Sequence, residues 1–248
     1  TASKLTLLLD GRVDAGETSI AGAGRHVDYG PFTVQAALTG EGPRAELVFA
    51  DPLPAAGLSD VRVALGPTED GFRIETSGGS MLGPFDGLLH LYAPEGGPTR
   101  VAIDRLEVWQ TNVTGEVTLG DDGAAGTLLL AGGGLDGTIS LAPRNGGQGF
   151  AVDLAANNAS FGGETPISIR RADIDVSGFF ADGSSTIEGT VRARGITYGS
   201  LFIGRLAADA NVTDGRGTFN AVVSGRRGSR FQMQLTGDIA PELIAAAA

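Results

Sequence analysis

Ile167-Ser168-Ile169-Arg170, followed closely by Asp173-Ile174-Asp175-Val176, alternates apolar and polar residues at every position. Such alternation predicts β-strands with one apolar and one polar face, because successive side chains point to opposite sides of a strand. The same pattern recurs in three further stretches: Val61-Arg62-Val63-Ala64-Leu65, Phe72-Arg73-Ile74-Glu75 and Phe231-Gln232-Met233-Gln234-Leu235. It restarts after Gly-, Asp- or Asn-rich turns along almost the whole chain. The sequence therefore predicts an all-β protein.

Composition supports one large β domain. The chain has 248 residues, enough to bury a core, and its 40 glycines show no three-residue period, so turns explain them better than collagen does. No long segment has a helical period, and only the tail from Pro241 to Ala248 is a candidate helix. We expect about sixteen strands and no domain boundary, so that residues 1–248 form a single elongated module.

The charge balance argues against nucleic acid as a partner. Eighteen basic and 29 acidic residues give a net charge of −11, and a phosphate backbone requires the opposite sign. No apolar run is long enough to span a bilayer, and the absence of cysteine fits either a reducing or an export compartment. The abrupt start in a strand and the uncapped alanine end predict that the chain is a fragment of a longer protein.

Catalytic motifs are scarce, which predicts a protein that is not an enzyme and holds no cofactor or metal. The two histidines, His26 and His90, are far apart in sequence, and His90 is expected to face solvent on its strand. Residues 132–137 match a dinucleotide-binding glycine pattern by letter, but they lead into a predicted strand and not into the helix that phosphate binding requires. Asp173 and Asp175 share one strand face, as alternating acids on a wet face do.

A weak internal repeat indicates a stacked architecture. The stretch His26–Phe32 resembles Gly195–Leu201, and both are followed by alternation. Leu82-Gly83-Pro84-Phe85 and Phe161-Gly162-Gly163 look like degenerate copies of the same apolar-glycine corner. Repetition of one supersecondary unit, each with an apolar face that it cannot bury alone, is typical of elongated folds.

These features, together with the run STIEGTVRARGITYG at residues 185–199, resemble the TamB proteins of the AsmA-like family, the translocation and assembly module proteins of Gram-negative bacteria. The resemblance covers essentially the whole chain. It implies an elongated, curved β-sheet folded into an open, taco-like groove with an apolar interior. It also implies a periplasmic protein, anchored to the inner membrane through a segment absent here, that carries phospholipid between the membranes and supports outer-membrane protein assembly. The implied partners are phospholipid acyl chains and, through another region, an Omp85-type outer-membrane protein.

The apolar residues at alternate positions of each predicted strand are the candidate lining of such a groove. The candidates are Leu47, Phe49, Val61, Val63, Phe72, Ile74, Leu89, Leu91, Ile139, Leu141, Val152, Leu154, Ile167, Ile169, Ile174, Val176, Leu201, Ile203, Phe231 and Met233. A one-residue slip in register would replace these side chains by polar ones, so the pattern fixes the register. Leu201 and Ile203 are the exception, because the intervening Phe202 is apolar too.

Two other classes of function share much of this sequence evidence. A structural or adhesive β-solenoid would seal the same apolar residues in a dry core. An enzyme on a β scaffold, acting on polysaccharide, would need a cleft with paired acids and stacking aromatics, for which Trp109 and three tyrosines are thin support. An open apolar face would favour the lipid groove, and a sealed one would favour the solenoid.

Overall fold

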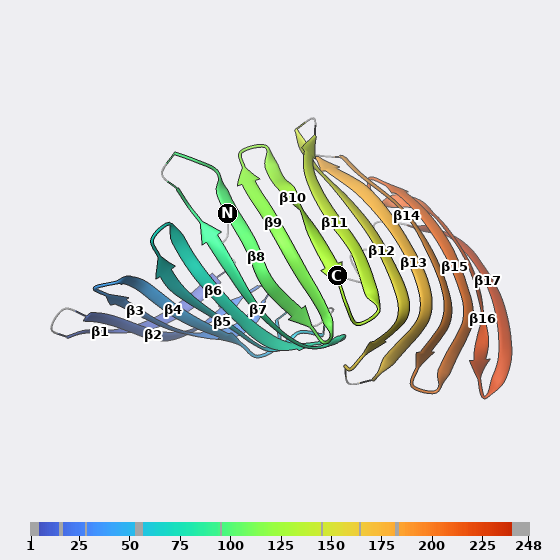
Figure 1. Cartoon of the computed structure of the whole chain (residues 1–248), viewed down its shortest axis with the longest axis horizontal. Coiled ribbons are helices and arrows are strands. Elements are labelled where there is room, and N and C mark those ends of the chain that lie inside the picture. Colours follow the sequence, from blue (N-terminus) through green and yellow to red (C-terminus); the bar gives the residue numbers. More distant parts are fainter. Residues whose placement is uncertain are drawn as a thin grey trace.

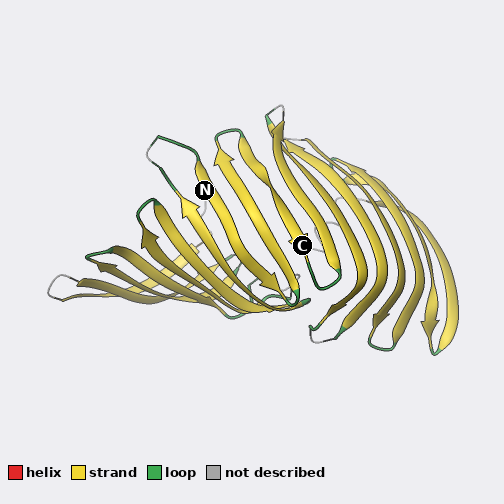
Figure 2. Cartoon of the chain, viewed as in Figure 1, coloured by secondary structure: helices red, strands yellow, loops and turns green. Residues whose placement is uncertain are grey.

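The computed structural model describes residues 5–14, 17–27, 29–52, 57–94, 96–144, 146–163, 165–181 and 184–239. Within these ranges every regular element is a β-strand, and no helix is present (Figure 2). The all-β prediction is therefore confirmed. The candidate helix from Pro241 to Ala248 lies outside the described residues.

In the described residues seventeen strands, close to the sixteen or so expected, form one open sheet (Figure 1). The strands are β1 (Leu5–Asp14), β2 (Glu17–His26), β3 (Gly30–Thr39), β4 (Gly42–Phe49), β5 (Ser59–Thr68), β6 (Gly71–Ser80), β7 (Gly83–Tyr92), β8 (Thr99–Val108), β9 (Thr111–Gly120), β10 (Gly123–Ala131), β11 (Leu135–Arg144), β12 (Gly147–Phe161), β13 (Ile167–Ala181), β14 (Ser184–Tyr198), β15 (Leu201–Thr213), β16 (Arg216–Arg227) and β17 (Ser229–Ile239). Each strand pairs antiparallel with the next one in the chain, so the sheet is a continuous meander.

The connections lie alternately on two rims of the sheet. Asp214-Gly215, between β15 and β16, has positive φ at both residues, as a two-residue turn that follows strand twist requires. The predicted repeats are also hairpin corners: Gly30 ends the β2–β3 turn and Gly199 lies in the β14–β15 turn, both with positive φ. All four predicted apolar-glycine corners join an even-numbered strand to the following odd one. They therefore share one rim.

The sheet bends strongly at this rim. On a flat sheet β7 and β12 would lie about 24 Å apart, because five spacings of about 4.8 Å separate them. Instead the backbone N–H of Gly162, just after β12, donates to the carbonyl of Leu82, just before β7, at 3.1 Å. The ring of Trp109 fills the space beside Gly162 and Gly83. Figure 1 shows the ends of β12 and β13 beside the β6–β7 tip.

A small packed cluster lies at this contact, which we call the seam. Its buried members are Ala156, Ala159, Phe161, Ala172 and Ala193. Leu82 packs against this cluster, as do Leu135, Ile167, Ile169, Ile196 and Leu206. Asn158 has φ 54° and is left out of the β12–β13 pairing, and the residues that follow it, Ala159 to Phe161, lead to Gly162 beside Leu82. Because the cluster consists of apolar side chains from one face, the sheet curls toward that face.

Candidate functional site: an uncovered apolar face

Cross-strand register places the apolar side chains on one face of the sheet, which we call the apolar face. Directly paired residues point to the same side of an antiparallel sheet, so a row of pairs can be followed from strand to strand. The first row, from β2 to β17, is Gly22, Val34, Leu47, Val63, Thr76, Gly87, Leu106, Val113, Leu130, Gly137, Leu154, Ile174, Val191, Ala208, Ala221 and Leu235. Thr76 is its one polar member, and its hydroxyl donates to the carbonyl of Arg62 at 3.1 Å.

The second row lies two residues along each strand from the first, or three on β8, where the pairing with β7 shifts, and it contains no polar side chain. From β2 to β17 it is Ile20, Ala36, Ala45, Leu65, Ile74, Leu89, Ile103, Gly115, Leu128, Ile139, Val152, Val176, Gly189, Ala210, Phe219 and Gly237. A third row runs from Pro67 through Phe72, Leu91, Leu141 and Phe150 and ends at Ile239, again without a polar side chain. The apolar face is thus continuous across the sheet.

All twenty candidate lining residues lie on this face. Most belong to the three rows, and the others lie in further rows on the same side, as Met233 and Phe231 do two and four residues before Leu235 on β17. Ile203 pairs with Ile196 on the apolar face, whereas Phe202 points to the opposite side, where Arg226 stacks on its ring at 5.3 Å. Ile167 and Ile169 differ from the rest because they pack against the seam. They belong to a packed contact and not to an open surface.

The apolar face is not sealed by a second layer in the described part of the chain. Residues of both complete rows are part-exposed almost throughout, whereas the inward residues of a two-layer sandwich would be buried. Apart from the seam, the buried apolar side chains among the described residues are Val61 and Leu130. At the edge strand β17, Met233 and Leu235 are each 45% exposed. The face therefore offers accessible apolar surface along its length.

On the apolar face, phenylalanine rings occupy the space above glycines of the neighbouring strand, where a side chain would otherwise stand. Phe150 pairs with Gly178, and a β-carbon on that glycine would collide with the ring. The same arrangement is found for Phe32 over Gly24, Phe85 over Gly78, Phe219 over Gly237 and Phe231 over Gly225. A ring that covers a strand glycine fills the gap left by the missing side chain. These glycines lie inside strands. From the sequence the glycines were explained by turns, and this role was therefore missed.

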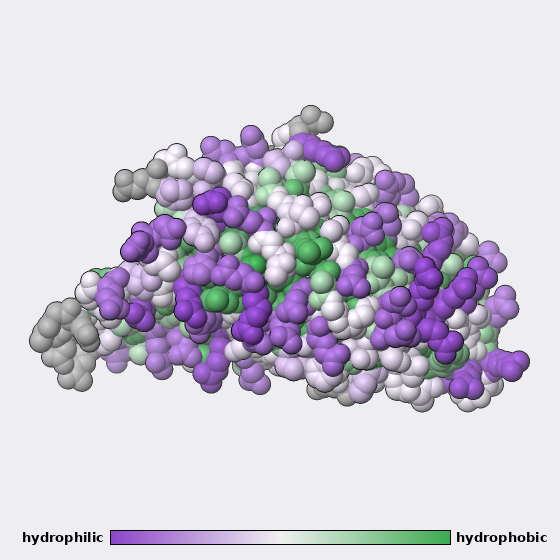
Figure 3. Space-filling model, in the orientation of Figure 1, coloured by the Kyte–Doolittle hydropathy of each residue, from purple (hydrophilic) through white to green (hydrophobic). Residues whose placement is uncertain are grey.

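The opposite face, which we call the polar face, carries the charges. Arg62 pairs with Glu46 at 3.2 Å and Arg105 with Asp86 at 2.7 Å, in both cases between neighbouring strands. Figure 3 shows this hydrophilic surface, with apolar patches confined mostly to its middle. Such exposed pairs contribute little stability, but they keep this side of a single-layer sheet in water.

Most of the residues considered for catalysis lie on the polar face or in turns, whereas His26 ends β2 on the same side as Gly22 of the apolar face. Asp173 and Asp175 pair with Ala155 and Asp153 across β12, on the polar face and exposed. His90 also lies on the polar face, as expected, and its Nδ1 is 2.6 Å from Asp104 Oδ2. Residues 132–134 form the β10–β11 turn and residues 135–137 begin β11, so the glycine pattern leads into a strand, again as expected. The described residues contain no group of three or more His, Asp or Glu side chains that could hold a metal.

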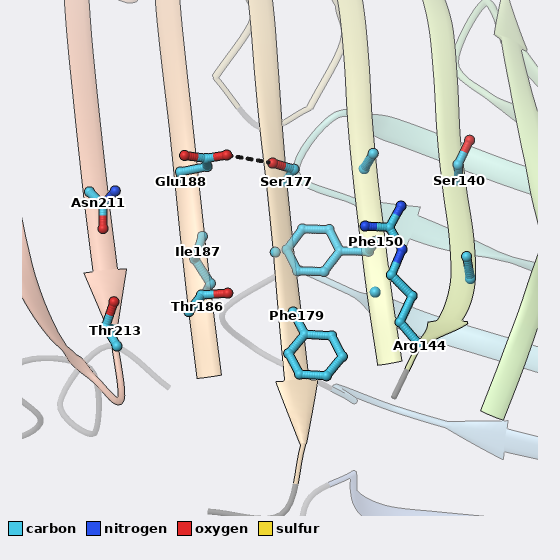
Figure 4. A pocket seen from close by; sticks show the side chains of 14 residues that line it. Ser140, Arg144, Phe150, Ser177, Phe179, Thr186, Ile187, Glu188, Asn211 and Thr213 are labelled. Atoms are coloured by element: carbon cyan, nitrogen blue, oxygen red, sulfur yellow. Dashed lines mark hydrogen bonds between the residues drawn. The ribbon is translucent and has the colours of Figure 1, made fainter. Parts of the chain in front are cut away.

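A shallow hollow of about 440 Å³ on the polar face spans β11 to β15. Figure 4 shows its lining, with the hydroxyl of Ser177 donating to Glu188 Oε1 at 3.4 Å and the ring of Phe179 at one end. Among the described residues that line it, Glu188 is the only carboxylate and Arg144 the only cation. Two carboxylates, as glycoside hydrolysis requires, are not brought together there.

Comparison of the chain with protein-family models, curated protein sequences and solved structures gives no match in any of the three. In the described residues, no helix is long and apolar enough to cross a membrane.

Proposed function

We propose that the apolar face carries the acyl chains of phospholipids along the sheet, with the head groups left in water. The observation that supports this most directly is the pair of apolar rows that cross from β2 to β17 without a charge and stay part-exposed. Transfer of a sixteen-carbon acyl chain from an apolar environment into water costs on the order of 12 kcal/mol of free energy, at about 0.8 kcal/mol per CH₂. A carrier must therefore offer apolar contact at every step, because one charged position would interrupt the path.

The dimensions and the lining suit sliding better than fixed binding. Seventeen strands at about 4.8 Å spacing give a track of about 75 Å along the curved sheet. The lining is mostly aliphatic, and the phenylalanine rings that take part lie over glycines. Neither complete row has a buried polar group that would recognise a particular ligand, so successive positions offer similar apolar contact. No acid, base or metal takes part in this function.

The proposed setting follows the resemblance to TamB proteins. The chain would act in the periplasm, tethered to the inner membrane by another segment, and deliver lipid toward the outer membrane in support of outer-membrane protein assembly. An Omp85-type protein would be its partner there, through a region other than this sheet.

Site-specific photo-crosslinking tests the proposal. A photoreactive amino acid at Val176, in the second row of the apolar face, should form adducts with phospholipid when the protein meets membranes, and mass spectrometry identifies the attached lipid. The same amino acid at Ala151, exposed on the polar face of neighbouring β12, is the control and should form none. Equal labelling at both positions, or none at Val176, contradicts the proposal. Absence of lipid at both would favour the structural solenoid.

A further inference from the structure

Arginines gather on the polar face of the last five strands. Arg171, Arg194 and Arg205 pair directly across β13, β14 and β15 and so form one row. Arg192 lies on the same face of β14, two residues from Arg194. Arg226 and Arg230 pair across β16 and β17, nearer the rim. We call these six residues the arginine patch.

The patch has fewer acidic partners for its arginines than the rest of this face. Each arginine of β4 to β8 has a carboxylate within 3.5 Å, as in Arg44–Glu41 at 2.6 Å and Arg100–Glu116 at 3.5 Å. In the patch the one ion pair among described residues is Arg171–Asp173, and its atoms are 3.7 Å apart. Asp173 also lies opposite Arg192 across β13 and β14, so six arginines share this one carboxylate within the patch. A protein with a net charge of −11 thus holds a local excess of positive charge.

The direct pairing of arginines across neighbouring strands destabilises the sheet. Like charges directly opposite each other on neighbouring strands are destabilising, and the patch contains two such sets. The polar face of β4 to β8 shows that the same sheet accommodates arginines with acids opposite them, as in Arg62–Glu46. An anion laid across the row would remove the repulsion. The cluster therefore fits a ligand better than it fits a structural role.

The geometry suits several phosphates on a surface. Four arginines and one carboxylate line a shallow hollow of about 310 Å³: Arg171, Arg192, Arg194, Arg205 and Asp173. Arg226 lies over the ring of Phe202, which supports its guanidinium group. The patch crosses five strands, about 20 Å, and Figure 3 shows dense hydrophilic surface over this part of the sheet, where Figure 1 places β13 to β17. Guanidinium groups bind phosphate oxygens with two parallel hydrogen bonds.

We propose that the arginine patch docks this end of the sheet on an anionic phospholipid bilayer. The inference rests on the proposed function, since a lipid-carrying face must come close to a membrane, and a basic patch on the opposite face would hold it there. Clusters of four to eight cations give such binding, and each one near the surface contributes to it. The acids of the adjoining rows, Asp175, Glu188 and Asp209, limit the patch to one area, which argues against a long polyanion such as nucleic acid.

Vesicle sedimentation tests the docking. The chain should bind phosphatidylcholine vesicles that contain about one third phosphatidylglycerol, and bind pure phosphatidylcholine far less. Arg194→Gln with Arg205→Gln should weaken binding by about thirtyfold, and the effect should shrink at high salt. The control, Arg62→Gln with Arg105→Gln, removes the same charge from the other half of the polar face and should leave binding within about twofold of the wild type. Thermal unfolding of all variants checks that each is folded.

The outcomes separate this proposal from the previous one. Equal losses in the patch and control variants would show a net-charge effect and overturn the docking. Binding that survives the patch variant but is lost in Ile174→Asp would mean that the apolar face makes the contact; docking then fails while lipid carriage stands. Patch-dependent binding without crosslinking at Val176 would mean that docking stands while lipid carriage fails. Binding to polyglutamate but not to anionic vesicles would assign the patch to an acidic protein segment and overturn the docking.

Discussion

Replacing Ile174 by aspartate tests whether the apolar face is an open track or one wall of a closed core. Ile174 lies in the first row between Leu154 and Val191 and is part-exposed. Losing about half of an isoleucine's burial energy costs about 1 kcal/mol, and the weakened cross-strand pairs add about 1 kcal/mol more. At about 2–4 °C for each kcal/mol in a chain of this length, the melting temperature should fall by about 4–8 °C.

The same variant should block lipid contact although it stays folded. A carboxylate in the first row interrupts the apolar path, so crosslinking of phospholipid at Val176 should drop to background. Circular dichroism follows the unfolding, and Ala151→Asp, which adds the same charge to the polar face, is the matched control. An unpaired carboxylate in a closed core costs several kcal/mol more and would unfold the protein at room temperature. That result, or undiminished crosslinking, would refute the open track.

Other changes probe the seam and the covered glycines. Ile169→Asp should destabilise more than Ile174→Asp, by at least about 2 kcal/mol in chemical denaturation, because Ile169 packs against the seam; equal costs would contradict this distinction. Gly178→Val should displace the Phe150 ring and cost about 1–3 kcal/mol, while Gly40→Ala, with open space around it, should change stability little. Trp109→Ala should cost about 2 kcal/mol and speed hydrogen exchange at residues 157–163; unchanged exchange there would show that the indole does not hold the seam.

Much of the fold follows from the strand period. Alternation at positions such as Val61, Ile74 and Ile174 decides which side chains share a face, because that property depends only on the two-residue repeat. All-β content and the division into an apolar and a polar face were therefore predictable. The meander order was not, since the sequence pattern is the same for any order of pairing.

The other features depend on register, which a single sequence does not give. Phe150 and Gly178 are distant in sequence, and only pairing of β12 with β13 brings the ring over the glycine. Arg171, Arg194 and Arg205 likewise meet only through the pairing of β13 with β14 and of β14 with β15. The seam between Leu82 and Gly162 arises from curvature, to which no local pattern points.

The meander has a consequence for how such a protein changes its length. Every strand takes its hydrogen bonds from the strands just before and after it in the chain, so a hairpin is a self-contained unit of the sheet. One hairpin with the same apolar–polar alternation could be inserted or deleted away from the seam, and the remaining strand pairs would stay in register. The sheet would become longer or shorter by about 10 Å, the spacing of two strands. Stability then grows roughly unit by unit, as in other repeat arrays, and the chain can form its sheet in order of synthesis. The length of the sheet can therefore change by whole hairpins while its apolar and polar faces stay the same.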